Sequence, residues 1–233
     1  MNNKTIGMKT KSFWNSNASV SLFSKQPISE YWLDFFTSHK RLNYRAKEKV
    51  LDLGCGAGRN IKMFLDLKYD VYACDLHENM VRAAKKTYLK NIKLNNQDIE
   101  DKIDELVVNC SMISLPYSDD FFDIILSHGV YHNAVSLAEF KKALRESVRV
   151  LKYNGYLCFN IFSSAYIDKG LKLMDKNLYV TKEGLLTVLL SKKIFLNIVH
   201  KSGLVSVGPV IEYISQVSTG KRAVMRGVLR KKY

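Results

Sequence analysis

Short apolar runs alternate with longer amphipathic segments along most of this chain. The runs predict strands buried in a parallel sheet, and apolar residues at helical spacing predict the helices between them. The expected strands are 50–53, 69–75, 106–109, 121–127, 156–162, 205–211 and 222–229, the last two as a closing antiparallel pair. The expected helices are 30–36, 59–67, 78–89, 139–151, 181–190 and 193–201. This alternation predicts an α/β fold built on a doubly wound, mostly parallel seven-stranded sheet.

The first expected strand stops at three alternating glycines, Gly54, Gly56 and Gly58. A buried parallel strand needs such glycines when it turns tightly into a helix whose N-terminal amides face a ligand. The same pattern is also typical of dinucleotide binding, so the glycines alone leave the class of ligand open.

Two acidic residues narrow the class of ligand. Asp52 precedes the glycines, where its carboxylate would repel a pyrophosphate but can approach the ammonium group of a cationic sulfonium cofactor. Asp75 lies 21 residues after Gly54 (75 − 54), at the tip of the second strand, where its carboxylate can accept from two ribose hydroxyls. The pair favours the sulfonium cofactor over a dinucleotide.

These residues, together with the block Leu-Pro-Tyr…Phe-Asp-Ile-Ile-Leu-Ser at 115–127, resemble class I S-adenosylmethionine-dependent methyltransferases from about Lys49 to the C-terminus. The resemblance implies a Rossmann-like fold and S-adenosyl-L-methionine as the cofactor. At Ser111 the family commonly has an acid that meets the adenine amino group, and the hydroxyl here is a departure from that pattern. The residues that the resemblance assigns to the cofactor are Asp52, Gly54, Gly56, Gly58, Asp75, Leu76, Ser111, Met112 and Ser127.

An aromatic segment at 13–40 precedes the glycines and predicts an N-terminal helical lid over residues 1–45, followed by one methyltransferase domain over 46–233. The resemblance implies that such a lid lies over the cofactor and shapes the acceptor site. The alternative is that these aromatic residues simply pack on the sheet. Trp14 and Tyr31 are the candidates for acceptor contacts.

His128, Tyr131 and His132 directly follow the fourth strand, where the family places acceptor-facing and catalytic groups. Histidine suits a general base because its ordinary pKa lies near neutral pH, and His132 is the first choice. A base is needed only if the acceptor is a hydroxyl of low acidity. The alternative is that these side chains only pack or hydrogen-bond the loop.

The chain has 233 residues, enough for one α/β domain, and a net charge of +14 from 36 basic and 22 acidic residues. This charge favours an anionic partner, whether a phosphorylated metabolite, a nucleic acid or an acidic membrane surface. It is also compatible with a lysine-rich surface that is merely well solvated.

The four cysteines fall on or beside expected strands, which predicts reduced core residues, and no metal site is expected. No apolar run approaches about 18 residues, so a cytoplasmic protein without a membrane span is expected.

The leading functional hypothesis is a methyltransferase that acts at oxygen or nitrogen of a small, anionic acceptor, such as a phosphorylated or nucleotide-linked sugar. A tRNA methyltransferase is the second hypothesis, supported by the basic C-terminal segment, although no added RNA-binding module is visible. A non-catalytic partner subunit with the same fold is the third, and a nucleotide-dependent oxidoreductase is a minor alternative.

Overall fold

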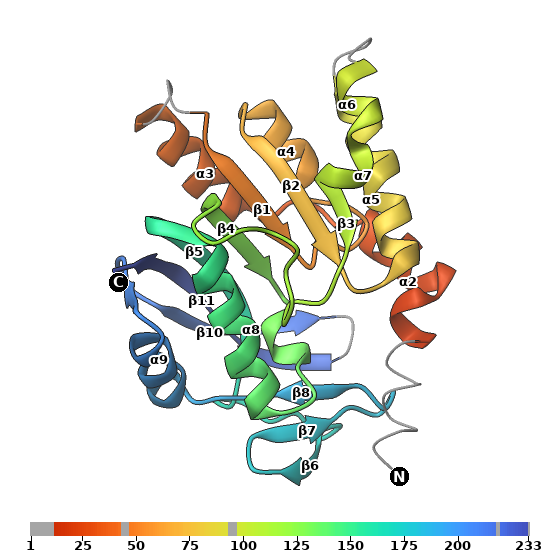
Figure 1. Cartoon of the computed structure of the whole chain (residues 1–233). Helices are drawn as coiled ribbons and strands as arrows, with labels where there is room; N and C mark the ends of the chain where they lie inside the picture. The colour runs from red at the N-terminus through yellow and green to blue at the C-terminus, as the bar shows by residue number, and fades with distance from the viewer. Residues whose placement is uncertain (1–11, 43–46, 93–96, 218–219, 233) are drawn as a thin grey trace. The chain divides into compact units, whose positions relative to one another are not determined.

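The computed structural model describes residues 12–42, 47–92, 97–217 and 220–232 (Figure 1). The chain forms two compact units. The glycine-loop unit is Trp14–Ser111, and the C-terminal unit is Met112–Tyr233 together with Met1–Phe13.

The glycine-loop unit contains three parallel strands in the spatial order β1 (Lys49–Leu53), β2 (Asp70–Asp75) and β3 (Val107–Asn109). The strand β1 is buried after Lys49, whereas β2 begins exposed at Asp70 and β3 buries only Val107. The register pairs Leu53 with Cys74 and Asp75 with Asn109, so the carboxyl ends of all three strands share one edge. That edge carries the glycine loop.

Six helices of this unit fall within the described residues: α2 (Asn17–Ser24), α3 (Glu30–Leu42), α4 (Ile61–Asp66), α5 (Glu78–Asn91), α6 (Gln97–Asp101) and α7 (Ile103–Leu106). The helix α3 is longer than the expected 30–36, and it buries Trp32 and Phe36. Phe36 meets Phe64 of α4 edge-on, with ring centroids 4.8 Å apart. The helix α3 is therefore part of the unit's core.

The C-terminal unit is built on the parallel pair β4 (Phe122–His128) and β5 (Leu151–Ser163). Antiparallel to β5 runs β11 (Gly220–Lys231), which also pairs with β10 (Ile211–Val217) and β9 (Leu204–Ser206). The helices are α8 (Leu137–Val150) and α9 (Lys192–Lys201), with a 3₁₀ turn η1 (Tyr131–Asn133). Buried aromatic rings connect them: Phe195 of α9 lies 4.7 Å from Phe159 of β5.

Two expected elements are wrong, one of them only in part. The expected helix 181–190 is extended chain, and it contributes β8 (Leu186–Val188) to a small antiparallel sheet with β7 (Leu178–Val180) and β6 (Lys172–Asp175). Gly184 interrupts helical geometry at φ +84°, and residues 184–190 are buried on every side, which removes the alternation that would reveal a strand.

The expected strand 205–211 is confirmed up to Ser206, where β9 pairs antiparallel with β11, and is wrong beyond that residue. Gly208 at φ +83° and the proline after it end the strand. The later segment β10 is the other antiparallel partner of β11.

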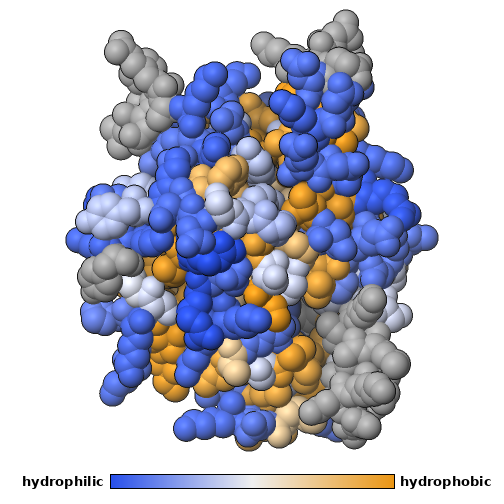
Figure 2. Space-filling model, viewed as in Figure 1, coloured by the Kyte–Doolittle hydropathy of each residue, from blue (hydrophilic) through white to orange (hydrophobic). Residues whose placement is uncertain are grey.

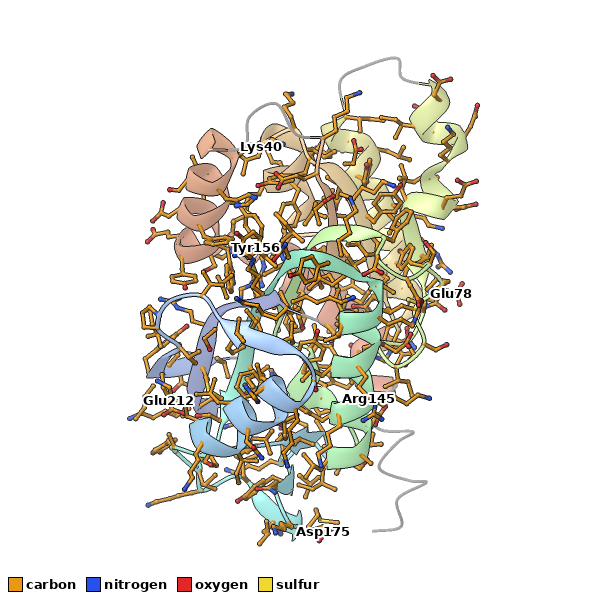
Figure 3. All side chains as sticks on the ribbon, turned by 60° about the vertical axis from the view of Figure 1, so that its left-hand side comes forward. Lys40, Glu78, Arg145, Tyr156, Asp175 and Glu212 are labelled. Atoms are coloured by element: carbon orange, nitrogen blue, oxygen red, sulfur yellow. The ribbon has the colours of Figure 1, made fainter. Side chains whose placement is uncertain are left out.

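Hydrophilic residues cover most of the face shown in Figure 2, and hydrophobic residues form smaller areas between them. Figure 3 shows labelled charged side chains on several elements, among them the exposed Arg145 on α8, Asp175 on β6 and Glu212 on β10. Among the helices that the structure describes, none is both long and apolar enough to cross a membrane.

Candidate functional site

The loop after β1 turns at positive φ, and two of its glycines have different roles. A Cβ on Gly58 would lie 3.0 Å from Ile61 Cδ1 and 3.1 Å from the Ala84 Cα, so glycine here lets the loop pack against α5. A Cβ on Gly56, at φ +55°, would meet nothing within 4 Å. The loop therefore presents bare backbone at Gly56, in front of which a ligand has room.

Asp75 joins the loops that follow β1 and β2. Its Oδ2 accepts from the Gly56 amide at 3.0 Å, and its Oδ1 accepts from the His77 amide at 2.9 Å. Each carboxylate oxygen has a further lone pair, so the group can also accept from a ligand hydroxyl. The structure thus fixes the Asp75 carboxylate next to the glycine loop, as the spacing predicts.

Asp52 is buried at the end of β1, and its Oδ1 accepts from Asn60 Nδ2 at 3.1 Å. The other oxygens of this pair, Asp52 Oδ2 and Asn60 Oδ1, are buried without a hydrogen-bond partner in the described structure. A buried acceptor without a donor is costly. Two such acceptors side by side are satisfied by a ligand that brings donors, above all an ammonium group.

Both carboxyls titrate abnormally because they are buried. Burial raises the pKa of Asp52 to about 6, against the lowering effects of Asn60 and the Arg59 charge. Burial also raises the pKa of Asp75, although the His77 and Gly56 amides oppose the shift. A cation bound near these groups would lower both pKa values, whereas a pyrophosphate would raise them further. The site is therefore suited to a positively charged ligand.

The residues present fit S-adenosyl-L-methionine. The Asp52–Asn60 pair can hold the ammonium group of this cofactor, and Asp75 can accept from its ribose hydroxyls. The open side of Gly56 leaves space for the part of the cofactor between them. Leu76, which follows Asp75, is 59% exposed and offers an apolar surface to an adenine ring. Ser111 ends this unit half-buried.

The N-terminal segment contacts the elements that surround the glycine loop. Arg59 Nη1 donates to Gln26 Oε1 at 2.8 Å, and Asn79 Nδ2 donates to the Asn15 carbonyl at 2.6 Å. The Trp14 ring stacks on His77 with centroids 6.3 Å apart. These contacts lie beside the predicted cofactor residues, and the role of residues 1–45 as a lid stays a prediction; residues 1–11 and 43–46 lie outside the described part.

In the C-terminal unit, Ser127 and His128 form the end of β4. Ser127 is buried, and its Oγ has no partner in the described structure. His128 and Met112 are half-buried. The cofactor roles predicted for Ser127 and Met112 stay predictions.

The two other residues predicted to be catalytic are held by the protein itself. The Tyr131 hydroxyl is buried against Ser147 Oγ at 2.6 Å. His132 Nδ1 accepts from the Phe162 amide at 3.2 Å, and the His132 ring stacks on the Phe162 ring with centroids 3.9 Å apart. Burial, and then the Arg222 charge, lower the pKa of His132 to about 3. This imidazole is neutral at neutral pH and is a weak base.

Two neighbours of His132, Phe162 and Arg222, were not predicted as part of the site. In the sequence they lie at ends of the expected strands 156–162 and 222–229, with no local signal for the contact. Arg222 is buried, and its Cζ lies 5.9 Å from the centre of the Phe162 ring. Among the described residues, no group of three or more His, Cys, Asp or Glu side chains could hold a metal ion.

Substituting Gly56 with alanine is expected to weaken the binding of S-adenosylhomocysteine at least tenfold, because the new methyl group would fill the open space in front of the loop. Gly208→Ala is a matched control, since Gly208 also has positive φ and no atom within 4 Å of its Cβ position. Both variants should lose about 1 kcal/mol of stability from backbone strain. Calorimetric titration and thermal unfolding measure the two effects, and equal affinity in both variants would contradict the assignment.

Comparison with known proteins identifies a methyltransferase domain in this chain. Residues 51–159 match the family model described as a methyltransferase domain. Over 120 residues the chain is 31% identical to the uncharacterized methyltransferase YcgJ of Bacillus subtilis (strain 168), covering 50% of this chain and 41% of that protein. Over 135 residues it is 32% identical to the ubiquinone/menaquinone biosynthesis C-methyltransferase UbiE of Pectobacterium atrosepticum, covering 56% of this chain and 49% of the relative. The chain spans less than half the length of either relative.

A solved structure with a similar fold is the 1,6-didemethyltoxoflavin-N1-methyltransferase of Burkholderia thailandensis, determined with 1,6-didemethyltoxoflavin and S-adenosylhomocysteine bound. The TM-score is 0.65 at 15% identity, over 100% of this chain and 92% of that one. This likeness confirms the expected Rossmann-like fold with a mostly parallel sheet. Together with the methyltransferase domain matched at 51–159, this fold is consistent with a class I S-adenosylmethionine-dependent methyltransferase.

Proposed function

We propose that this protein transfers the methyl group of S-adenosyl-L-methionine to an oxygen or nitrogen atom of a small, anionic acceptor, such as a phosphorylated or nucleotide-linked sugar. The observation that carries the proposal is the pair of carboxylates, the buried Asp52 and the half-buried Asp75, beside the open backbone at Gly56. This arrangement fits a cationic cofactor with a ribose, which is the cofactor of the family.

When bound, this cofactor supplies a methyl carbon activated by the sulfonium: the acceptor's lone pair forms a bond to it while the carbon–sulfur bond breaks and its electron pair stays on sulfur. The residues of the chain bind this cofactor and orient it. Asp75 fixes the ribose, and the Asp52–Asn60 pair fixes the amino-acid end. Such alignment can supply about 7 to 11 kcal/mol of the barrier.

If the acceptor is a hydroxyl, His128 is the better candidate for the base that takes its proton. His128 is half-buried at the end of β4, whereas His132 is fully committed to its backbone hydrogen bond and has a pKa of about 3. This order reverses the preference drawn from the sequence. We assign Tyr131 and His132 to positioning the segment after β4.

The acceptor class is tested by incubating the protein with methyl-labelled cofactor and three separate pools: sugar phosphates, nucleotide sugars and tRNA at low and high salt. Label in either sugar pool, with little dependence on salt, is the expected result. Label in tRNA that falls steeply with salt would replace the proposed acceptor with RNA, because phosphate contacts release counterions. The Asp75→Ala variant is the control for transfer that depends on the glycine loop.

Absence of label in all three pools, with cofactor binding intact, would contradict the acceptor proposed here. Absence of cofactor binding itself would favour the non-catalytic partner subunit.

A further inference from the structure

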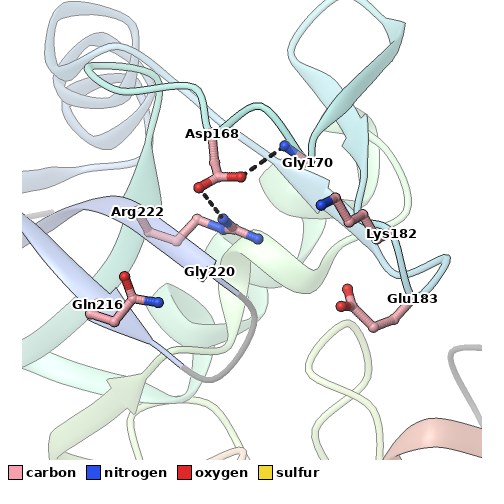
Figure 4. Close-up of a pocket in the computed structure, with 7 residues that line it drawn as sticks. All are labelled: Asp168, Gly170, Lys182, Glu183, Gln216, Gly220 and Arg222. Carbon is pink, nitrogen blue, oxygen red and sulfur yellow. Dashed lines mark hydrogen bonds and ion pairs between the residues drawn. The ribbon is translucent and has the colours of Figure 1, made fainter.

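A polar cavity of about 340 Å³ lies within the C-terminal unit (Figure 4). Its walls come from the segment after β5, the connection between β7 and β8, and the facing ends of β10 and β11. This volume is at the lower end of the range for small-ligand sites. The side chains that line it with charges or an amide are Asp168, Lys182, Glu183, Gln216 and Arg222.

Arg222 connects this cavity to the functional edge of the sheet. The residue after it, Ala223, pairs with Ser163, the last residue of β5. Arg222 therefore lies at the carboxyl edge of the parallel pair β4 and β5, and ligands of open α/β sheets bind at this edge.

Arg222 is also a buried cation, with only 3% of its side chain exposed. Its Nη1 donates to the Lys221 carbonyl at 2.9 Å and lies 4.0 Å from Asp168 Oδ2, which is too long for a direct hydrogen bond. Burial lowers the pKa of Arg222, and the Asp168 and Glu183 charges oppose that shift. An anionic group of a ligand beside the guanidinium would oppose it further.

Asp168 is held in place by the backbone. Its Oδ1 accepts from the Gly170 amide at 2.8 Å, and its Oδ2 accepts from the Lys221 amide at 3.2 Å. In Figure 4 its carboxylate is directed toward Arg222, while Lys182 and Glu183 come from the opposite wall. Asp168 thus positions Arg222.

Contacts continue from Arg222 to the turn after β4. The guanidinium lies over the Phe162 ring, and that ring stacks on His132 of η1. The charge of Arg222 reaches His132, since it is one of the two causes that lower the pKa of that imidazole. An anion bound at Arg222 would therefore change the electrostatic environment of the His132 imidazole.

We propose that this cavity binds a hydroxylated anion, with Arg222 and Lys182 holding a carboxylate or phosphate group and Gln216 and Glu183 bonding to its hydroxyls. The inference rests on the proposed function, because the anion assigned to the cavity is the proposed anionic acceptor. The cavity has two basic and two acidic lining side chains, so the anionic group would lie at Arg222 and Lys182, away from Glu183. The chain's net charge of +14 favours its approach.

The test is calorimetric titration of the protein, saturated with S-adenosylhomocysteine, with glucose 6-phosphate, glucuronate, glucose and inorganic phosphate. We expect glucose 6-phosphate or glucuronate to bind and Arg222→Gln to weaken that binding at least tenfold, with Arg222→Lys in between. Arg226→Gln is the matched control, because Arg226 lies on the same strand but over the Tyr213 ring, 4.7 Å from its centre. It should change the affinity less than twofold.

Imidazole resonances of His132 should shift on titration with the anion in the wild type but not in Arg222→Gln. Thermal unfolding and S-adenosylhomocysteine affinity identify a variant that has merely lost its fold. Equal weakening by Arg222→Gln and Arg226→Gln, or binding of none of the anions, would overturn the cavity assignment. Loss of S-adenosylhomocysteine binding by the wild type would instead overturn the proposed function.

Discussion

Asp75→Ala is expected to weaken the binding of S-adenosylhomocysteine more than a hundredfold. The substitution removes the acceptor for two ribose hydroxyls, and a hydrogen bond to a charged group contributes about 1.5 to 3 kcal/mol. It also releases the Gly56 and His77 amides that the carboxylate now holds at 3.0 and 2.9 Å. Loss of ligand contacts and loss of loop order therefore act in the same direction. Calorimetric titration measures the affinity.

Asp70→Ala is the control for this variant, because Asp70 is exposed at the opposite end of the same strand. It should bind S-adenosylhomocysteine within twofold of the wild type. Thermal unfolding checks that the Asp75 variant remains folded at the titration temperature. An Asp75→Ala protein that is folded and binds with unchanged affinity would refute the ribose role.

Asp52→Asn is expected to stabilise the protein and to weaken cofactor binding in the same variant. A carboxyl whose pKa is raised from 3.8 to about 6 by burial carries a cost of about 3 kcal/mol when ionised at neutral pH. Asparagine removes the charge, but its amide still needs partners, so a gain of about 1 to 2 kcal/mol is expected. For a chain of this length that gain raises Tm by roughly 2 to 8 °C.

The pH dependence of the unfolding free energy also tests the burial of the Asp52 carboxylate, because the direction of the change is fixed. The folded state holds the Asp52 proton more tightly than the unfolded state, so the unfolding free energy should fall as pH rises from 3.8 through about 6. Above that range the stabilising contribution of the protonated Asp52 is fully lost. Asp52→Asn should lack this contribution, and Asp34→Asn, at an exposed position on α3, should keep it.

Cofactor affinity should respond to Asp52 in the opposite direction. The ionised carboxylate attracts an ammonium group, so S-adenosylhomocysteine should bind more weakly as pH falls through about 6. Asp52→Asn should bind about 10 to 100 times more weakly at neutral pH, consistent with the loss of one close charge pair. A variant that is less stable and binds as well as the wild type would show that Asp52 serves the fold rather than the ligand.

Much of the fold follows from local sequence signals. The strands β1, β2 and β4 are apolar runs with clear ends, and α8 and α9 have apolar residues at helical spacing. The expected helix 181–190 is wrong because residues 184–190 are buried on both faces and so show no strand alternation. There, burial in the small sheet overrides a local pattern compatible with helix.

The proximity of Asp52, Gly56 and Asp75 was predictable because strand ends in a parallel sheet share an edge. Their role in binding the cofactor stays a prediction. The contact between His132, Phe162 and Arg222 was not predictable, since it joins the turn after β4 to β5 and β11, which lie far apart in the sequence. Only tertiary packing makes His132 a buried, weakly basic side chain.

The central claim is that the glycine loop binds the cofactor of the family. Its most direct test is calorimetric titration of the wild-type protein with S-adenosylhomocysteine at neutral pH and at two temperatures. The second temperature is needed because binding with an enthalpy near zero gives no heat signal. We predict saturable binding at one site per chain. Absence of saturable binding at both temperatures would contradict the claim.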